Sequence, residues 1–277
     1  MSGAPTIREA LDAAQQVTDR IEARVLLREV LKQSDAYLLA HGDDLLTAEQ
    51  AQQYVALVVR RVAGEPVAYI TGRREFYGRE FVVTPSVLIP RPETELLVEL
   101  ALQRLPVGAS GRVLDLGAGS GCIGITIAAE RPEAQVTLVD ASETALEIAR
   151  ANAAQWASAN TTLLHSDWYS AVAAERYDLI VANPPYVAEG DAHLQQGDLR
   201  FEPRSALASG VDGLNDLQQI IARAPQHLRA GGWLLLEHGF DQAVACAWLL
   251  EAAGFQDVFN APDLAGVPRV SGGRLQD

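Results

Sequence analysis

The stretch VLDLGAGSG occupies residues 113–121, where an apolar run leads into three alternating glycines. An apolar run of this length that ends in turn residues predicts a buried strand, and the apolar residues 122–130 that follow predict a helix. Gly117, Gly119 and Gly121 permit a backbone that lies directly against a ligand, where any Cβ would clash, and the helix start offers free N–H groups. The stretch therefore predicts a strand, a loop and a helix that together bind a nucleoside cofactor.

An acidic residue on the next strand supports this prediction. Asp140 ends the expected strand 135–140, 19 residues after Gly121, at the place where an acid accepts hydrogen bonds from ribose hydroxyls. The type of cofactor stays open at this point, because residues 119–124 also satisfy the G-x-G-x-x-G pattern of NAD(P) enzymes. Asp115, just before the loop, would repel a pyrophosphate but suits the cationic methionyl part of S-adenosylmethionine.

The rest of the C-terminal part alternates apolar strands with helical stretches. Such alternation predicts an α/β fold with a doubly wound, Rossmann-like parallel sheet, whose functional groups lie at the carboxyl ends of the strands. The expected strands are residues 112–116, 135–140, 161–165, 177–182 and 232–237, and the expected helices are residues 122–130, 142–156 and 214–228.

The N-terminal part has a different pattern. Residues 6–65 place apolar side chains at helical spacing, with an expected N-cap at Thr47 and its capping partner Gln50, and predict a small all-helical domain. After a Gly-Glu-Pro break, two short β-prone pieces around a glycine in residues 76–83 predict a β-hairpin that links two domains. A further helix is expected over residues 93–105.

Composition limits the classes of function. The 277 residues include 22 basic and 36 acidic side chains, a formal net charge of −14, and residues 1–90 carry 10 basic and 12 acidic side chains against 12 and 24 in residues 91–277. This acidic surplus disfavours a nucleic-acid substrate, which needs clustered Lys and Arg. Without a secretory signal pattern or an apolar run that could span a membrane, a cytoplasmic protein is expected. Cys122 and Cys246 are far apart and the histidines lack ligand spacing, so neither a disulfide nor a metal site is expected.

The expected strand 177–182 ends in Asn183-Pro184-Pro185-Tyr186. Two prolines fix two φ angles and remove two N–H donors, so the turn is stiff and its carbonyls are left free to accept. The Asn183 side-chain oxygen and the Pro184 carbonyl can each accept one N–H of a planar amide or amino group, while Tyr186 packs on its plane. The nitrogen lone pair then faces a sulfonium methyl, and catalysis proceeds by orientation and polarising hydrogen bonds. The turn therefore favours methyl transfer to a planar nitrogen over hydride transfer.

Taken together, these segments resemble the release-factor glutamine N5-methyltransferases of the PrmC/HemK type along most of the chain. Beside the glycine loop and the turn at residues 183–186, the resemblance rests on GEPVAYITG at residues 64–72, EF at 75–76, LIPRPETE at 88–95, FEP at 201–203, AL at 206–207 and LLEHG at 235–239. It implies a helical substrate-recognition domain at residues 1–73, a β-hairpin linker at 74–90 and a class I S-adenosylmethionine-dependent methyltransferase domain at 91–277. Residues 266–274 depart from the family by an unusual proline and an extra glycine, so we expect a weak final strand.

The resemblance also implies the chemistry and the site. S-adenosyl-L-methionine is the implied cofactor, and the implied methyl acceptor is the glutamine of the Gly-Gly-Gln motif in peptide chain release factors 1 and 2, with no direct nucleic-acid, membrane or metal partner. Arg91 is expected near the active-site rim. The implied cofactor contacts are Gly117, Ala118, Gly119, Ser120, Gly121, Asp140, Trp168 and Asn183. The implied substrate contacts are Asn183, Pro184, Pro185 and Tyr186, of which Asn183, Pro184 and Tyr186 are the expected catalytic residues.

Three other functions stay open. The sister activity on a ribosomal-protein glutamine uses the same turn, and so does N6-methylation of adenine in DNA or RNA. The adenine reaction needs base flipping and a basic footprint, which the acidic composition disfavours. A non-catalytic binding module that retains the methyltransferase fold is the third alternative.

Overall fold

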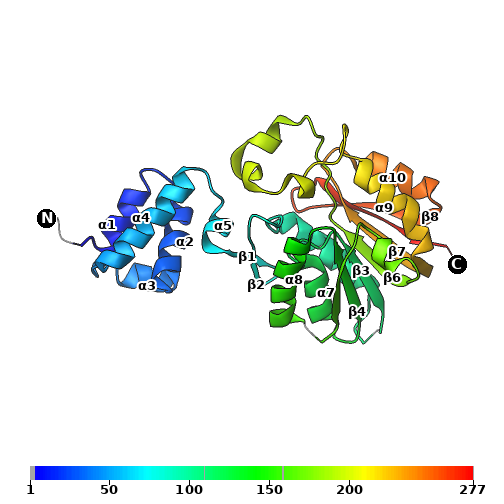
Figure 1. Cartoon of the computed structure of the whole chain (residues 1–277), viewed down its shortest axis with the longest axis horizontal. Helices are drawn as coiled ribbons and strands as arrows, with labels where there is room; N and C mark the ends of the chain where they lie inside the picture. Colours follow the sequence, from blue (N-terminus) through cyan, green and yellow to red (C-terminus); the bar gives the residue numbers. More distant parts are fainter. Residues whose placement is uncertain (1–3, 109, 158, 277) are drawn as a thin grey trace. The chain divides into compact units, whose positions relative to one another are not determined.

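A computed structural model describes residues 4–108, 110–157 and 159–276, which divide into two compact units. The first unit comprises residues 4–73 together with Gln196–Phe201, and the second comprises residues 74–195 and 202–276. Figure 1 labels many of the elements of both units. Within the described residues no helix has both the length and the apolar character needed to cross a membrane.

The first unit is helical. Two helices begin with a capping box, in which a threonine and the residue three positions later satisfy each other's backbone N–H, and one of these is the predicted Thr47–Gln50 pair. The core packs around Leu26 and Leu27, which are fully buried, and the Tyr54 hydroxyl donates to the Ala23 carbonyl at 3.0 Å. The helices are α1 (Ile7–Ala14), α2 (Arg20–Leu31), α3 (Asp35–Ala40), α4 (Ala48–Val62) and α5 (Val67–Thr71).

A segment distant in sequence completes this first unit. Gln196–Phe201 contains the 3-10 turn η4 (Gly197–Phe201) and follows the Asn183–Tyr186 turn along the chain. Arg61 Nη1 donates to Asp198 Oδ1 at 3.2 Å, and Arg200 Nη2 donates to the Ala63 carbonyl at 3.1 Å. The helical unit therefore includes part of a loop that begins and ends in the other unit.

The predicted hairpin is present as β1 (Arg73–Phe76) and β2 (Arg79–Val82). Tyr77 and Gly78, with φ of 52° and 72°, form the two-residue turn at positive φ that matches the natural twist of paired strands. Asn152 of α8 (Glu143–Trp156) fixes β2, because its side chain accepts from the Val82 N–H at 2.8 Å and donates to the Val82 carbonyl at 3.0 Å. The hairpin is thus packed on the second unit.

The second unit is built on a seven-stranded sheet in the order β5-β4-β3-β6-β7-β9-β8. Neighbouring strands from β5 to β7 are parallel, and β9 is antiparallel to both of its neighbours. The α/β class and the Rossmann-like sheet predicted from the sequence are confirmed. The strands are β3 (Arg112–Leu116), β4 (Gln135–Asp140), β5 (Thr161–His165), β6 (Tyr177–Ala182), β7 (Leu228–Glu237), β8 (Phe255–Pro262) and β9 (Pro268–Leu275).

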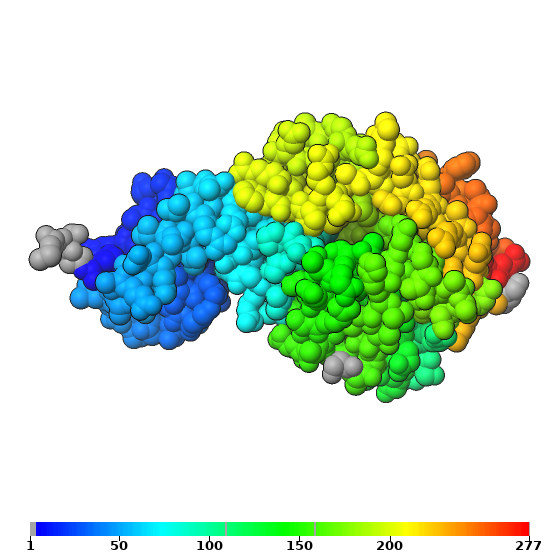
Figure 2. Space-filling model, viewed as in Figure 1, coloured from blue at the N-terminus to red at the C-terminus, as the bar shows by residue number. Residues whose placement is uncertain are grey.

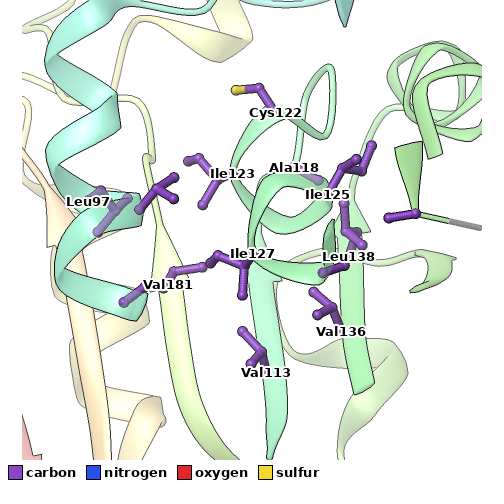
Figure 3. Close-up of a cluster of buried hydrophobic side chains, with 14 of the residues drawn as sticks. Leu97, Val113, Ala118, Cys122, Ile123, Ile125, Ile127, Val136, Leu138 and Val181 are labelled. Carbon is purple, nitrogen blue, oxygen red and sulfur yellow. The ribbon is translucent and has the colours of Figure 1, made fainter. Parts of the chain in front are cut away.

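Helices cover both faces of this sheet. On one face, apolar side chains of α6 and α7 meet the strands, as Figure 3 shows for Leu97, Ile123 and Ile127 beside Val113 and Val181. On the other face, α9 and α10 contribute Leu217, Ile220, Cys246 and Leu250 to a second buried cluster. The helices are α6 (Glu95–Arg104), α7 (Cys122–Glu130), α8, α9 (Asn215–Arg223) and α10 (Ala243–Ala252), with 3-10 turns η1 (Pro92–Thr94), η2 (Ser170–Val172), η3 (Ala192–Gln195), η5 (Arg204–Ala206) and η6 (Ala224–Gln226).

Some predicted elements differ from the structure. The helix expected over residues 214–228 ends at Arg223, because Pro225 cannot continue the backbone hydrogen bonding and a 3-10 turn follows. The expected weakness of the final strand is wrong, since β9 is paired along both edges. Its glycines are required there: a Cβ at Gly272 would lie 2.6 Å from Leu235 Cδ2, and one at Gly273 would lie 2.8 Å from Phe255 Cβ.

Candidate active site

The second unit contains a cavity of about 320 Å³ at the carboxyl ends of β3, β4 and β6. Figure 2 shows a recess between the yellow and green parts of this unit. A volume of this size suits a small-molecule ligand. Among the predicted site residues, the cavity is lined by Gly117, Ala118, Gly119, Ser120, Asp140, Trp168, Asn183 and Pro185, whereas Gly121, Pro184 and Tyr186 do not line it.

The glycine loop forms one wall of the cavity. Gly117, Gly119 and Gly121 have φ of 71°, 56° and 80°, in the region that favours glycine. A Cβ at Gly117 would lie 3.3 Å from the Trp168 ring, and a Cβ at Gly119 would meet no protein atom within 4 Å. Gly121 is the N-cap residue of α7 and gives the turn into that helix. At Gly119 the loop therefore presents bare backbone to open space, whereas a Cβ at Gly121 would lie 2.4 Å from Ile125 Cδ1, so packing requires that glycine.

Asp140 stands beside this loop. Its carboxylate accepts from the Gly119 N–H and from the Ser142 N–H, each at 2.8 Å, and it lines the cavity. Two hydrogen bonds leave a carboxylate with further lone pairs, which can accept from hydroxyl groups of a ligand. Asp140 thus both fixes the loop and offers acceptors to the cavity.

Asp115 lies behind the loop rather than in the cavity wall. It is fully buried, and its Oδ2 accepts from the Gly124 N–H at 2.9 Å. Burial raises the pKa of Asp115 to about 7. A Cβ at Gly124 would lie 2.8 Å from that same oxygen, so packing of α7 on β3 accounts for the last glycine of the G-x-G-x-x-G pattern.

Trp168 closes the cavity beside Gly117. Its φ of 44° lies in the left-handed region, which is uncommon for a residue with a side chain. The Ser166 hydroxyl donates to the Trp168 carbonyl at 2.7 Å and accepts from the Ala171 N–H at 2.9 Å. These bonds hold the loop after β5 so that the indole ring faces the glycine loop.

The Asn183–Tyr186 turn follows β6 at the same edge of the sheet. Asn183 Nδ2 donates to the Thr94 hydroxyl at 3.3 Å, and the Tyr186 carbonyl accepts from Gln242 Nε2 at 3.0 Å. Within the described parts of the chain, Asn183 Oδ1 and the Pro184 carbonyl accept no hydrogen bond. The Tyr186 hydroxyl donates to Glu237 Oε1 at 3.4 Å, and burial raises the pKa of Tyr186. The turn is therefore held at both ends while two acceptors remain free.

Buried acidic residues that the sequence analysis left without a role support the cavity. Glu202 accepts from the Ile89 N–H at 3.1 Å and pairs with Arg91, which lines the cavity as expected for a rim residue. These contacts join the segments at 88–95 and 201–203 that the family resemblance had singled out. Glu237 follows three leucines, Leu234–Leu236, and that apolar run is a sequence signal that its carboxylate would be buried.

Comparison with known proteins covers both units. A model of the PrmC N-terminal domain matches residues 6–72, and a model of the methyltransferase small domain matches residues 93–201. A release factor glutamine methyltransferase of Bordetella pertussis is 52% identical, over 92% of this chain and 95% of that protein. One of Escherichia coli is 44% identical over 97% of both chains.

A solved structure supports the fold. A methyltransferase from Pyrococcus furiosus superposes with a TM-score of 0.55 at 18% identity, over 79% of this chain and 98% of that one. The two release factor glutamine methyltransferases are 52% and 44% identical to this chain over nearly its full length. This similarity confirms the resemblance inferred from the motifs. The chain belongs to the release factor glutamine methyltransferase family.

Proposed function

We propose that this protein transfers a methyl group from S-adenosyl-L-methionine to the side-chain amide nitrogen, N5, of the glutamine in the Gly-Gly-Gln motif of peptide chain release factors. The observation that carries the proposal is the position of the Asn183–Tyr186 turn, because Asn183 and Pro185 line the same cavity as Gly117 and Gly119 of the glycine loop. The family membership supports the same reaction.

The residues of the cavity suit the cofactor. S-adenosyl-L-methionine supplies a methyl group activated by a sulfonium centre. Gly117 to Gly121 would lie against it, because the open space beside Gly119 is where a side chain would compete with a ligand. Asp140 would accept from the ribose hydroxyls, and the Trp168 ring would lie beside the adenine.

The acceptor amide is oriented by the turn. Asn183 Oδ1 and the Pro184 carbonyl would each accept one N–H of the glutamine side chain, with Pro185 and Tyr186 completing the substrate contacts. When both N–H groups of the amide donate to these two acceptors, the plane of the amide is fixed. The nitrogen lone pair is then directed at the methyl group. Orientation and polarisation of this kind accelerate a reaction without a strong base, and the amide nitrogen releases one of its protons once it has gained the methyl group.

The charge distribution supports a protein substrate. Residues 91–277 carry 12 basic and 24 acidic side chains, which repel a phosphate backbone, whereas residues 1–90 are nearly balanced at 10 and 12. We assign substrate recognition to the helical domain at residues 1–73, linkage to residues 74–90 and methyl transfer to residues 91–277. A cytoplasmic location is part of the same proposal.

Methyl transfer with isotope-labelled S-adenosyl-L-methionine tests the proposal. The purified protein is incubated with a release factor and, as the matched control, with the same factor carrying alanine in place of the Gly-Gly-Gln glutamine. We expect label on the first and none on the second. Equal labelling of both, or labelling of DNA, RNA or ribosomal protein instead, would contradict the proposed acceptor.

A further inference from the structure

One buried amide side chain lies beside the Asn183–Tyr186 turn, outside the segments on which the family resemblance rests. Gln242 is the N-cap residue of α10 and is 8% exposed, although glutamine side chains usually lie on the surface. It does not line the cavity. A buried amide costs free energy unless its donors and its acceptor are hydrogen-bonded, so its partners indicate what it does.

The hydrogen bonds of Gln242 use both ends of its amide. Oε1 accepts from the Gly239 N–H at 2.9 Å. Nε2 donates to the Tyr186 carbonyl at 3.0 Å and to the Asp212 carbonyl at 3.4 Å. Reversing the amide would turn Oε1 toward two carbonyl oxygens and Nε2 toward an N–H, so only this orientation satisfies all the partners.

The backbone around this amide is fixed as well. The Gln242 N–H donates to the Gly239 carbonyl at 3.1 Å, and the Gln242 carbonyl accepts from the Cys246 N–H at 2.9 Å. Gly213 has φ of 77°, and a Cβ there would lie 2.2 Å from the Tyr186 carbonyl oxygen and 2.8 Å from Gln242 Nε2. The donor that reaches Tyr186 therefore stands on the start of a helix, in a space that only a glycine leaves open.

The bond to the Tyr186 carbonyl supplies a restraint that the prolines of the turn do not. Pro184 and Pro185 fix two φ angles, but a proline ring does not fix ψ, and the φ and ψ of Tyr186 are not constrained by any ring. The next residue is held separately, because the Val187 N–H donates to the Leu207 carbonyl at 2.9 Å. The Gln242 bond thus restrains the one residue between the stiff prolines and the paired segment, and with it the direction in which the Tyr186 ring projects.

We propose that Gln242 is a positioning residue, which fixes the backbone of Tyr186 and so places the Tyr186 ring on the plane of the substrate amide without touching the substrate. The inference rests on the proposed function for the identity of the substrate. The geometry itself depends only on the hydrogen bonds of Gln242.

Kinetic variants test the positioning role. Gln242→Glu keeps the size of the side chain and replaces its N–H donors by an oxygen that faces the Tyr186 and Asp212 carbonyls. The matched control is Asn160→Asp, because Asn160 is also 8% exposed and its Nδ2 donates to three backbone carbonyls at 3.0 to 3.2 Å, before β5 and at the end of the sheet opposite to the cavity. We expect Gln242→Glu to lower kcat about tenfold with unchanged Kd for the cofactor, and Asn160→Asp to keep kcat despite a comparable loss of Tm.

A double-mutant cycle separates action through Tyr186 from a general loss of structure. In Tyr186→Ala, which has no ring to place, Gln242→Glu should lower kcat by about twofold at most. A loss as large as in the wild-type background would overturn the proposal, and so would equal kcat in Gln242→Glu and Asn160→Asp. Thermal unfolding and circular dichroism verify the fold of each variant. If Gln242→Glu does not fold, Gln242→Met replaces it, because it keeps the length of the side chain without an N–H donor, and we expect a similar loss of kcat.

A second readout is independent of the substrate. Exchange of the Val187 N–H with solvent, measured by NMR on the protein alone, reports how freely the backbone next to Tyr186 opens. Gln242→Glu should accelerate this exchange about tenfold relative to the wild type, and Asn160→Asp should leave it unchanged. Equal exchange in all three proteins would refute the positioning role. A wild type that labels no release factor would instead contradict the proposed function.

Discussion

Replacing Gly119 with alanine separates backbone strain from loss of ligand space. Gly119 has φ of 56° and Gly254 has φ of 89°, and a Cβ at either position would meet no protein atom within 4 Å. Both Gly119→Ala and Gly254→Ala should therefore cost about 1–2 kcal/mol of stability, the penalty of a left-handed backbone, and lower Tm by a few degrees. Only Gly119 lines the cavity, so only its new methyl group would compete with the cofactor.

The size of the binding effect follows from that competition. Inserting a methyl group into a filled site costs about 1–3 kcal/mol, which weakens binding by about 5- to 150-fold. Isothermal titration calorimetry with S-adenosyl-L-methionine measures Kd for the wild type, Gly119→Ala and Gly254→Ala. We expect a weaker Kd for the first variant alone. Equal Kd in the two variants, at comparable Tm, would show that the glycine loop does not lie against the cofactor.

Three further changes probe the site. Asn183→Ala should lower kcat by about 100-fold or more while the cofactor Kd changes little, because it removes an acceptor for the substrate amide; methyl-transfer kinetics measure this, and unchanged turnover would refute its role. Asp140→Ala should weaken cofactor binding by about tenfold, which calorimetry would detect, while turnover at saturating cofactor changes less. Burial raises the pKa of Asp115 to about 7 from 3.8. The folded chain then retains a proton that the unfolded chain releases, so from pH 4 to 7 the wild type should lose up to about 4 kcal/mol of stability relative to Asp115→Asn. Urea unfolding across this pH range measures it, and a difference that does not vary with pH would contradict the buried, protonated state.

Local sequence patterns predicted much of this fold. The strands β3 to β6 and the helix α7 have the expected bounds, because each is a short apolar run that ends at a turn or glycine signal. The tight turn at Tyr77-Gly78 likewise follows from a glycine between two β-prone segments. Such features depend on neighbours in sequence, and they were predictable for that reason.

Elements that depend on distant neighbours were not predicted correctly. The glycines at Gly272 and Gly273 lower the local preference for a strand, yet they are what lets β9 approach Leu235 and Phe255. β7 begins at Leu228, where Tyr177 pairs with it, four residues before the expected start. Pairing with distant strands determines both the stability of β9 and the start of β7. The hydrophobic periodicity within one segment carries no information about such pairing.

The site likewise contains features that depend on neighbours in sequence and features that depend on distant segments. The glycine loop, Asp140 and the Asn183–Tyr186 turn follow from motifs whose residues are adjacent or one crossover apart. The contact of the Glu202 carboxylate with the Ile89 N–H requires two signature segments from different parts of the chain to meet. Neither segment alone indicates that meeting, so these residues remained without a role until the fold was known.

Mass spectrometry of release factors from cells with and without this protein tests the central claim most directly. The account predicts one added methyl group on the glutamine of the Gly-Gly-Gln motif in cells that contain the protein, and an unmodified glutamine in cells that lack it or carry Asn183→Ala. A glutamine that is methylated to the same extent in all three would contradict the account.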